Sequence, residues 1–175
     1  MGGITLITVG ILLVISYEDF TYRLIHWYYF PLVAGLLLLQ KVQQEQLYAS
    51  MINIGVNLLI IIFMLLMTTL IYSARRGKLV LIIDNAIGKA DILVFIILCI
   101  SLSPINLVLF MLLSFLVAIL FQILTYPFTN NARYIPLAGI ISTLLSVALI
   151  LQEKYPFINL TNDFQTLGAI GHIYF

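Results

Sequence analysis

The sequence predicts an all-α, polytopic membrane protein with about six transmembrane helices. Of its 175 residues, 63% are apolar and only 9% are Asp, Glu, Lys or Arg, and the mean hydropathy is +1.15. This composition excludes an ordinary soluble domain. Because roughly 20 residues cross a hydrocarbon core of about 30 Å, the length allows about six crossings joined by short loops. We therefore predict a six-helix transmembrane domain over residues 1–151 and a short extracytoplasmic tail over residues 152–175.

Uncharged runs mark the predicted spans in chain order. The first run ends at Tyr17 and lacks both a basic start and an obvious cleavage site, so it predicts a retained helix and not a signal peptide. The next spans are predicted over about 27–40 and 51–72. An uncharged run over 92–132 is too long for one crossing and is divided into a short helix and a long one by a polar break. The break consists of Ser101, Ser103, Pro104 and Asn106, and the sixth span is predicted over about 134–151.

The distribution of basic residues predicts the orientation. With six crossings, one face of the membrane receives Arg23, Arg75, Arg76, Lys78, Lys89 and Arg133, and the other receives only Lys41 and Lys154. This positive-inside bias predicts that both termini face outward and that the loops near 18–27, 73–91 and 127–134 are cytoplasmic. The aromatic residues predicted to form a belt on the same side are Tyr17, Tyr22, Trp27, Tyr28, Tyr72, Tyr126 and Tyr134.

Charge and cysteine usage exclude several classes of function. A net charge of +1 without a block of Lys and Arg gives no indication of nucleic-acid binding. Cys99 is the only cysteine, so an intramolecular disulfide and a cysteine-ligated zinc module are excluded. His26 has no second histidine or cysteine nearby, and we interpret it as an interfacial anchor. We expect no metal site and no cofactor.

Two carboxylates carry the functional hypothesis. Asp19 and Asp91 each lie where an apolar stretch meets a polar one, and the predicted topology puts both on the cytoplasmic side. A carboxylate at the edge of a bilayer is costly unless it is paired, hydrated or functional. Two carboxyl groups held close together share a proton, so that one activates water while the other polarises a carbonyl group. Such a pair requires the first and fourth helices to be neighbours.

Each of these residues also has a purely structural interpretation. Asp91 precedes an apolar helix and is equally suited to stabilising the first turn of that helix. Glu18 and Asp19 are also explained as solvated charges beside Arg23 at the membrane surface. Asp84 and Asn85 are typical of a turn, and Gly88 would allow a tight loop before the fourth helix.

Three segments resemble the motifs of the type IV prepilin peptidase family, the membrane aspartic peptidases that include archaeal preflagellin peptidases. The segment from Asp19 to Trp27 is similar to D-x-x-x-x-x-I-P-N, with His26 and Trp27 in place of proline and asparagine. The tetrad Gly88-Lys89-Ala90-Asp91 is similar to G-x-G-D, with alanine replacing the second glycine. A family lysine two residues after that aspartate is Leu93 here. The segment Arg133-Tyr134-Ile135-Pro136-Leu137-Ala138-Gly139 is similar to the start of the last core helix.

The resemblance covers roughly residues 5–150 and implies that Asp19 and Asp91 are a catalytic pair. It implies cleavage of a prepilin-like substrate, with a basic leader and an apolar helix, at the cytoplasmic face of the inner membrane. Arg23, Gly88, Lys89, Ala90 and Pro136 would support the motifs or contact the substrate. The chain lacks the cysteine-containing N-terminal extension of larger members, so we expect peptidase activity without methyltransferase activity.

Two other classes of function stay open at this stage. A protein that kept the fold and became an assembly or scaffold subunit of a secretion or pilus system is suggested by Ala90, because a Cβ there alters the loop. A small transporter would bind a cation at Asp19 or Asp91, but such sites lie near the midplane on broken helices. Pilin and secretion-ATPase genes beside this one would favour the peptidase.

Overall fold

The computed structural model describes residues 2–43, 47–77, 87–125, 135–155 and 159–163. Over these ranges the chain is all-helical, as the sequence predicts. The six helices are α1 (Gly3–Tyr22), α2 (Tyr29–Gln43), α3 (Leu47–Arg76), α4 (Lys89–Ser101), α5 (Pro104–Thr125) and α6 (Leu137–Lys154). Asp84, Asn85, Lys78, Arg133, Tyr126, Tyr134 and His172 lie outside the described residues.

Four of these helices are long and apolar enough to cross a membrane: α1, α3, α5 and α6. The other two, α2 with 15 residues and α4 with 13, are shorter than the roughly 20 residues of a full crossing. α6 continues to Lys154 and so passes the predicted domain border at residue 151 by about one turn. The described part of the chain is therefore helical and has four candidate membrane spans.

The predicted division between the fourth and fifth helices is confirmed, and its cause is local. α4 ends at Ser101 and is followed by Leu102, whose backbone is extended. Pro104 then opens α5 at the first helical position, where a missing N–H costs nothing. The carbonyl of Ser103 accepts the N–H of Leu107 at 2.8 Å and so begins the hydrogen bonds of α5. The polar break is therefore a tight turn between two helices.

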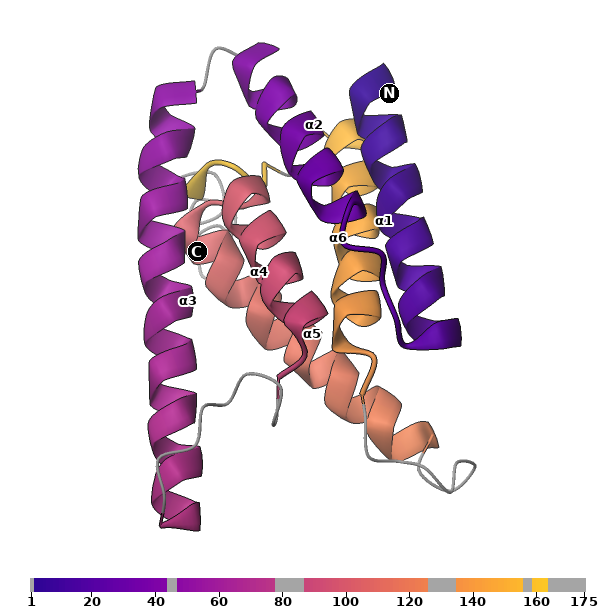
Figure 1. Cartoon of the computed structure of the whole chain (residues 1–175). Coiled ribbons are helices and arrows are strands. Elements are labelled where there is room, and N and C mark those ends of the chain that lie inside the picture. The colour runs from indigo at the N-terminus through magenta and orange to yellow at the C-terminus, as the bar shows by residue number, and fades with distance from the viewer. Residues whose placement is uncertain (1, 44–46, 78–86, 126–134, 156–158, 164–175) are drawn as a thin grey trace, which may run out of the picture.

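α6 holds the bundle together (Figure 1). α1 packs along it more extensively than any other pair of helices does, and α4 and α5 also contact it. α2 lies between α1 and α4, while α3 packs against α2, α4 and α5. The fully buried side chains of the core come from these contacts and include Leu12, Ile15, Val33, Val94, Phe95, Leu98, Ile141 and Leu145. α3 and α5 diverge towards one end of the molecule (Figure 1).

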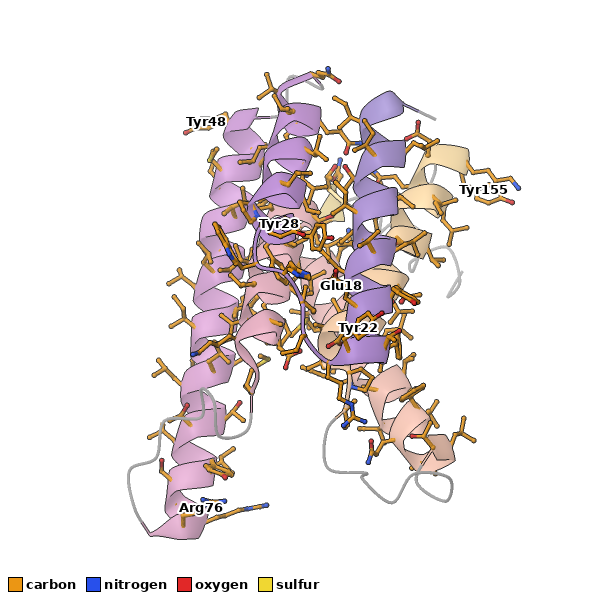
Figure 2. The ribbon with its side chains drawn as sticks, turned by 45° about the vertical axis from the view of Figure 1, so that its right-hand side comes forward. Glu18, Tyr22, Tyr28, Tyr48, Arg76 and Tyr155 are labelled. Carbon is orange, nitrogen blue, oxygen red and sulfur yellow. The ribbon has the colours of Figure 1, made fainter. Side chains whose placement is uncertain are left out.

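Large apolar side chains cover the outside of α3 and α5. Examples with about half or more of their surface exposed are Leu59, Phe63, Leu66, Leu70, Leu112, Leu116 and Leu124. Soluble monomers rarely expose so many large apolar side chains, whereas the interior of a membrane is itself apolar. Figure 2 places Tyr48 and Tyr155 at one end of the bundle and Arg76 at the other.

Candidate functional site

Asp19 lies in the last turn of α1 and faces the start of α6. The helix ends because Arg23 adopts a left-handed conformation (φ 55°), with its N–H shared between the carbonyls of Glu18 and Asp19 at 3.1 and 3.2 Å. The half-buried carboxylate of Asp19 accepts the backbone N–H of Gly139 at 2.6 Å. The amides at a helix N-terminus are unpaired within the helix, so a carboxylate is a favourable partner there.

Gly139 makes this approach possible. A Cβ at this position would lie 3.1 Å from both Cβ and Oδ2 of Asp19, and 3.2 Å from Cε2 of Phe20. These distances are shorter than about nine in ten real contacts of a Cβ atom, so the neighbouring side chains would have to shift by a few tenths of an ångström. The sequence shows Gly139 three residues after Pro136, in the third family-like segment, but it gives no sign of this close contact. Gly139 is a site residue that the sequence prediction missed.

Asp91 lies in the first turn of α4 and reaches the same place from the other side. Its Oδ2 accepts the N–H of Gly88 at 3.2 Å, so the structural interpretation as a first-turn acid is confirmed. Burial, together with the negative charge of Asp19, raises the pKa of Asp91 from 3.8 to about 6. Hydrogen bonds from the backbone amides of Gly88 and Ala138 act in the opposite direction.

Both aspartates therefore lie near the first turn of α6. Asp19 accepts the backbone N–H of Gly139, and the pKa of Asp91 is affected by the amide of Ala138 and by the charge of Asp19. The sequence argument required α1 and α4 to be neighbours, whereas in the structure each of them packs on α6. Two carboxyl groups near one helix N-terminus, one of them with a raised pKa, can together supply a proton donor and a base.

The other predicted site residues surround this pair in different ways. Pro136 precedes α6, and its carbonyl accepts the N–H of Ile140 at 3.1 Å. Arg23 and Lys89 are exposed, while Ala90 is partly buried against the core. Gly88 has an ordinary extended backbone (φ −71°), so its position does not require glycine for conformational reasons.

Glu18 and His26 form a cluster that the sequence prediction missed. The Nδ1 atom of His26 lies 3.0 Å from both carboxylate oxygens of Glu18, and the backbone N–H of His26 donates to Oε2 at 3.2 Å. The hydroxyl of Tyr29 donates to Oε1 at 3.4 Å. Although the His26 side chain is 62% exposed, that of Glu18 is only 12% exposed. Glu18 is therefore a partner of the α1–α2 connection and not a solvated surface charge, and His26 is more than an interfacial anchor.

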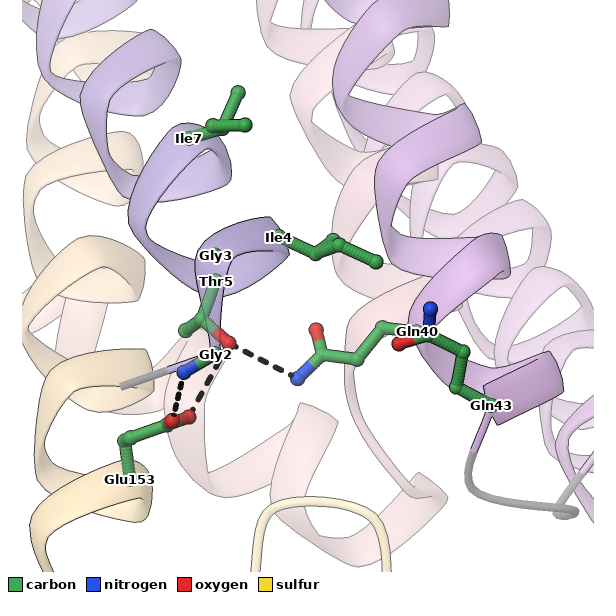
Figure 3. A pocket seen from close by; sticks show the side chains of 8 residues that line it. All are labelled: Gly2, Gly3, Ile4, Thr5, Ile7, Gln40, Gln43 and Glu153. Carbon is green, nitrogen blue, oxygen red and sulfur yellow. Dashed lines mark hydrogen bonds between the residues drawn. The ribbon is translucent and has the colours of Figure 1, made fainter.

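A cavity of about 560 Å³ lies at the opposite end of the bundle (Figure 3). It is lined by the start of α1, the last part of α2 and the end of α6. The carboxylate of Glu153 accepts the N–H of Gly2 and, at 3.2 Å, the hydroxyl of Thr5. Gln40 Nε2 donates to the same hydroxyl at 3.4 Å. These bonds join three helix ends, and the cavity contains neither aspartate of the pair.

The described residues contain no group of three or more His, Cys, Asp or Glu side chains that could hold a metal ion. Comparison with known proteins found no matching family model, no matching curated protein and no matching solved structure.

Proposed function

We propose that this chain is a membrane aspartic endopeptidase that removes the basic leader of type IV prepilin-like substrates. The observation that supports this most is that Asp19 and Asp91, from two different helices, both lie near the first turn of α6. A water molecule bound between the two carboxyl groups would be activated by Asp19 as the base. Asp91, which holds its proton to a higher pH, would donate it to the scissile carbonyl.

The surroundings of the pair suit a substrate with a basic leader and an apolar helix. The carboxylates of Glu18 and Asp19 attract positive charge, although Arg23 and Lys89 reduce this attraction. The apolar helix would stay in the bilayer beside the exposed apolar surface of α3 and α5. This assignment places the protein in the cytoplasmic membrane as a multi-pass protein, with the aspartates on the cytoplasmic side. No cofactor, methyl transfer or nucleic acid enters the reaction.

Leader removal from a co-expressed prepilin tests the proposal directly. Wild-type chain is expected to shorten the prepilin on a gel, while Asp19→Asn and Asp91→Asn remove cleavage by a factor of about 10³ or more, because each aspartate is part of one unit. The membrane levels of the variants are measured in parallel by immunoblotting. Cleavage that persists in both variants at normal protein levels would exclude the aspartate mechanism.

A scaffold subunit without activity is the second candidate. It is supported by the bond from Gly88 to Asp91, because capping a helix is a sufficient structural reason to retain that aspartate. It is also supported by Ala90, which packs against the core where the family motif has glycine. If wild-type chain cleaves no prepilin but Ala90→Gly does, the alanine has suppressed a competent site. Absence of cleavage by both would favour the scaffold.

A further inference from the structure

The outer end of α4 lies at a depth where unpaired backbone groups are costly. Its 13 residues measure about 20 Å, against about 30 Å for a hydrocarbon core. Figure 1 shows that α4 stops well before the corresponding ends of α2 and α3, where a full crossing would continue. Within a membrane, the last carbonyls of α4 and the first amides of α5 need partners inside the protein.

Asn57 of α3 supplies partners for the end of α4. Its side chain is 0% exposed, and its Nδ2 donates to the carbonyls of Cys99 at 3.0 Å and Leu102 at 2.7 Å. A buried amide that holds two carbonyls of one helix end resists any movement of that end along the helix axis.

Residues 159–163 supply partners for the start of α5. Asp163 Oδ1 accepts the hydroxyl of Ser103 at 2.5 Å and the N–H of Ile105 at 3.1 Å. The carbonyl of Leu160 accepts the N–H of Ser103 at 2.9 Å. Residues 159–163 therefore lie against the α4–α5 turn, and a carboxylate about 60 residues away in sequence completes the first turn of α5.

These bonds act on Asp91 through α4. The helix is a short rigid rod with Asp91 in its first turn and the bonded turn at its other end, and Val94, Phe95 and Leu98 are fully buried between the two. A shift of α4 along its axis would move Asp91 relative to Ala138 and to Asp19. Asp19 would not follow, because it belongs to α1 and is bound by Gly139 of α6. We propose that Asn57 and Asp163 are positioning residues, which set the height of α4 and thereby the approach of Asp91 to Asp19.

This inference rests on the proposed function for its significance, but its test does not require activity. Full-length chain carrying Asp19→Cys, Asp91→Cys and Cys99→Ala is treated in membranes with a short bifunctional thiosulfonate reagent, and the rate of internal crosslinking is measured. We expect Asn57→Leu to slow crosslinking about tenfold, since reactions between two held groups depend steeply on their geometry. The matched control is Asn53→Leu, one turn earlier on α3, which should crosslink like the parent.

Asp163 provides an independent variant in a different segment. Asp163→Ala should slow crosslinking, whereas Asp163→Asn retains an acceptor oxygen and should restore most of the rate. If Asp163→Ala slowed crosslinking only by destabilising the protein, Asp163→Asn would not restore the rate. Circular dichroism verifies that each variant is helical. If Asn57→Leu fails to accumulate in the membrane, the crosslinking rate of Asp163→Ala alone tests the positioning role.

Three results would overturn the proposal: parental rates in both Asn57→Leu and Asp163→Ala, equal slowing by Asn53→Leu, or no crosslinking in the parent. A chain that crosslinks as expected but cleaves no prepilin would remove the peptidase function and leave the positioning role intact.

Discussion

Gly139 determines how closely two helices approach at the candidate site. Its lack of a Cβ leaves room for the Asp19 side chain, and its N–H then binds that carboxylate. The same position thus provides both the space and the hydrogen bond. A larger residue would fill the space needed by the Asp19 side chain and so weaken its hydrogen bond to the N–H of residue 139.

Gly139→Ala is therefore expected to reduce prepilin cleavage by at least tenfold and to destabilise the protein by about 1–3 kcal/mol, as overpacking does. Thermal unfolding in detergent and the cleavage assay measure the two effects. Gly55→Ala on α3 is the matched control, because an added Cβ there meets nothing within 4 Å. It should be neutral or stabilise by up to about 1 kcal/mol. Equal behaviour of the two variants would contradict the role of Gly139.

The protonation of Asp91 links stability to pH. Since its pKa rises from 3.8 to about 6 on folding, the folded state binds more protons between these values. The contribution of Asp91 to stability is thus complete below about pH 4 and is lost as the pH rises through about 6. Melting temperatures measured from pH 4 to pH 7 should fall more steeply in wild type than in Asp91→Asn. Identical slopes would show that Asp91 is ionised throughout.

Among the elements, the α1–α2 connection depends on Glu18. The His26 ring that binds this carboxylate also contacts the rings of Tyr28 and Tyr29, with centroids at 5.3 and 6.1 Å. Arg23, at the start of the connection, is exposed and suitable for trypsin.

His26→Ala should accelerate trypsin cleavage after Arg23 about fivefold, because the loss of a largely exposed hydrogen bond to a carboxylate, worth about 1 kcal/mol, frees the connection. Trp27→Ala changes a neighbouring side chain that is 73% exposed and serves as the control. Mass spectrometry of the digests identifies the cleavage site. An unchanged rate in His26→Ala would mean that the connection is held by other contacts.

The helices could be predicted because the causes of their breaks are local. Ser103 and Pro104 end one helix and begin another wherever they lie, so the α4–α5 turn was found from the sequence. Helix ends are predicted less accurately, because charged residues do not always mark where a helix stops. α3 instead continues through Arg75 and Arg76, because basic residues are favourable at a helix C-terminus.

For the whole molecule, the positive-inside argument predicts which end faces the cytoplasm. In a Cys99→Ala background, Arg23→Cys and Arg76→Cys should react with an impermeant maleimide only from the cytoplasmic side. Tyr48→Cys, which lies at the other end of the bundle (Figure 2), should react only from outside. Labelling of intact and permeabilised cells measures this. Labelling of all three from one side would refute the predicted orientation.

The candidate site could be predicted only in part. Asp19 and Asp91 were found because charged residues are rare in this chain and their location is informative. Their meeting point could not be derived, since it depends on how α1 and α4 pack against α6 and on backbone amides, which leave no pattern in a sequence. The pairing of Glu18 with His26 was missed for the same reason, because it depends on the path of the connection between two helices.

The length of α3 has a consequence for the lipid itself. Thirty residues measure about 45 Å, which exceeds a hydrocarbon core of about 30 Å by roughly a third of the helix. Such hydrophobic mismatch is relieved by tilting the helix or by locally thickening the bilayer. Because Arg75 and Arg76 end α3, their guanidinium groups oppose immersion of that end and favour anionic headgroups. In a membrane, a helix of this length would favour thick regions of bilayer over thin ones.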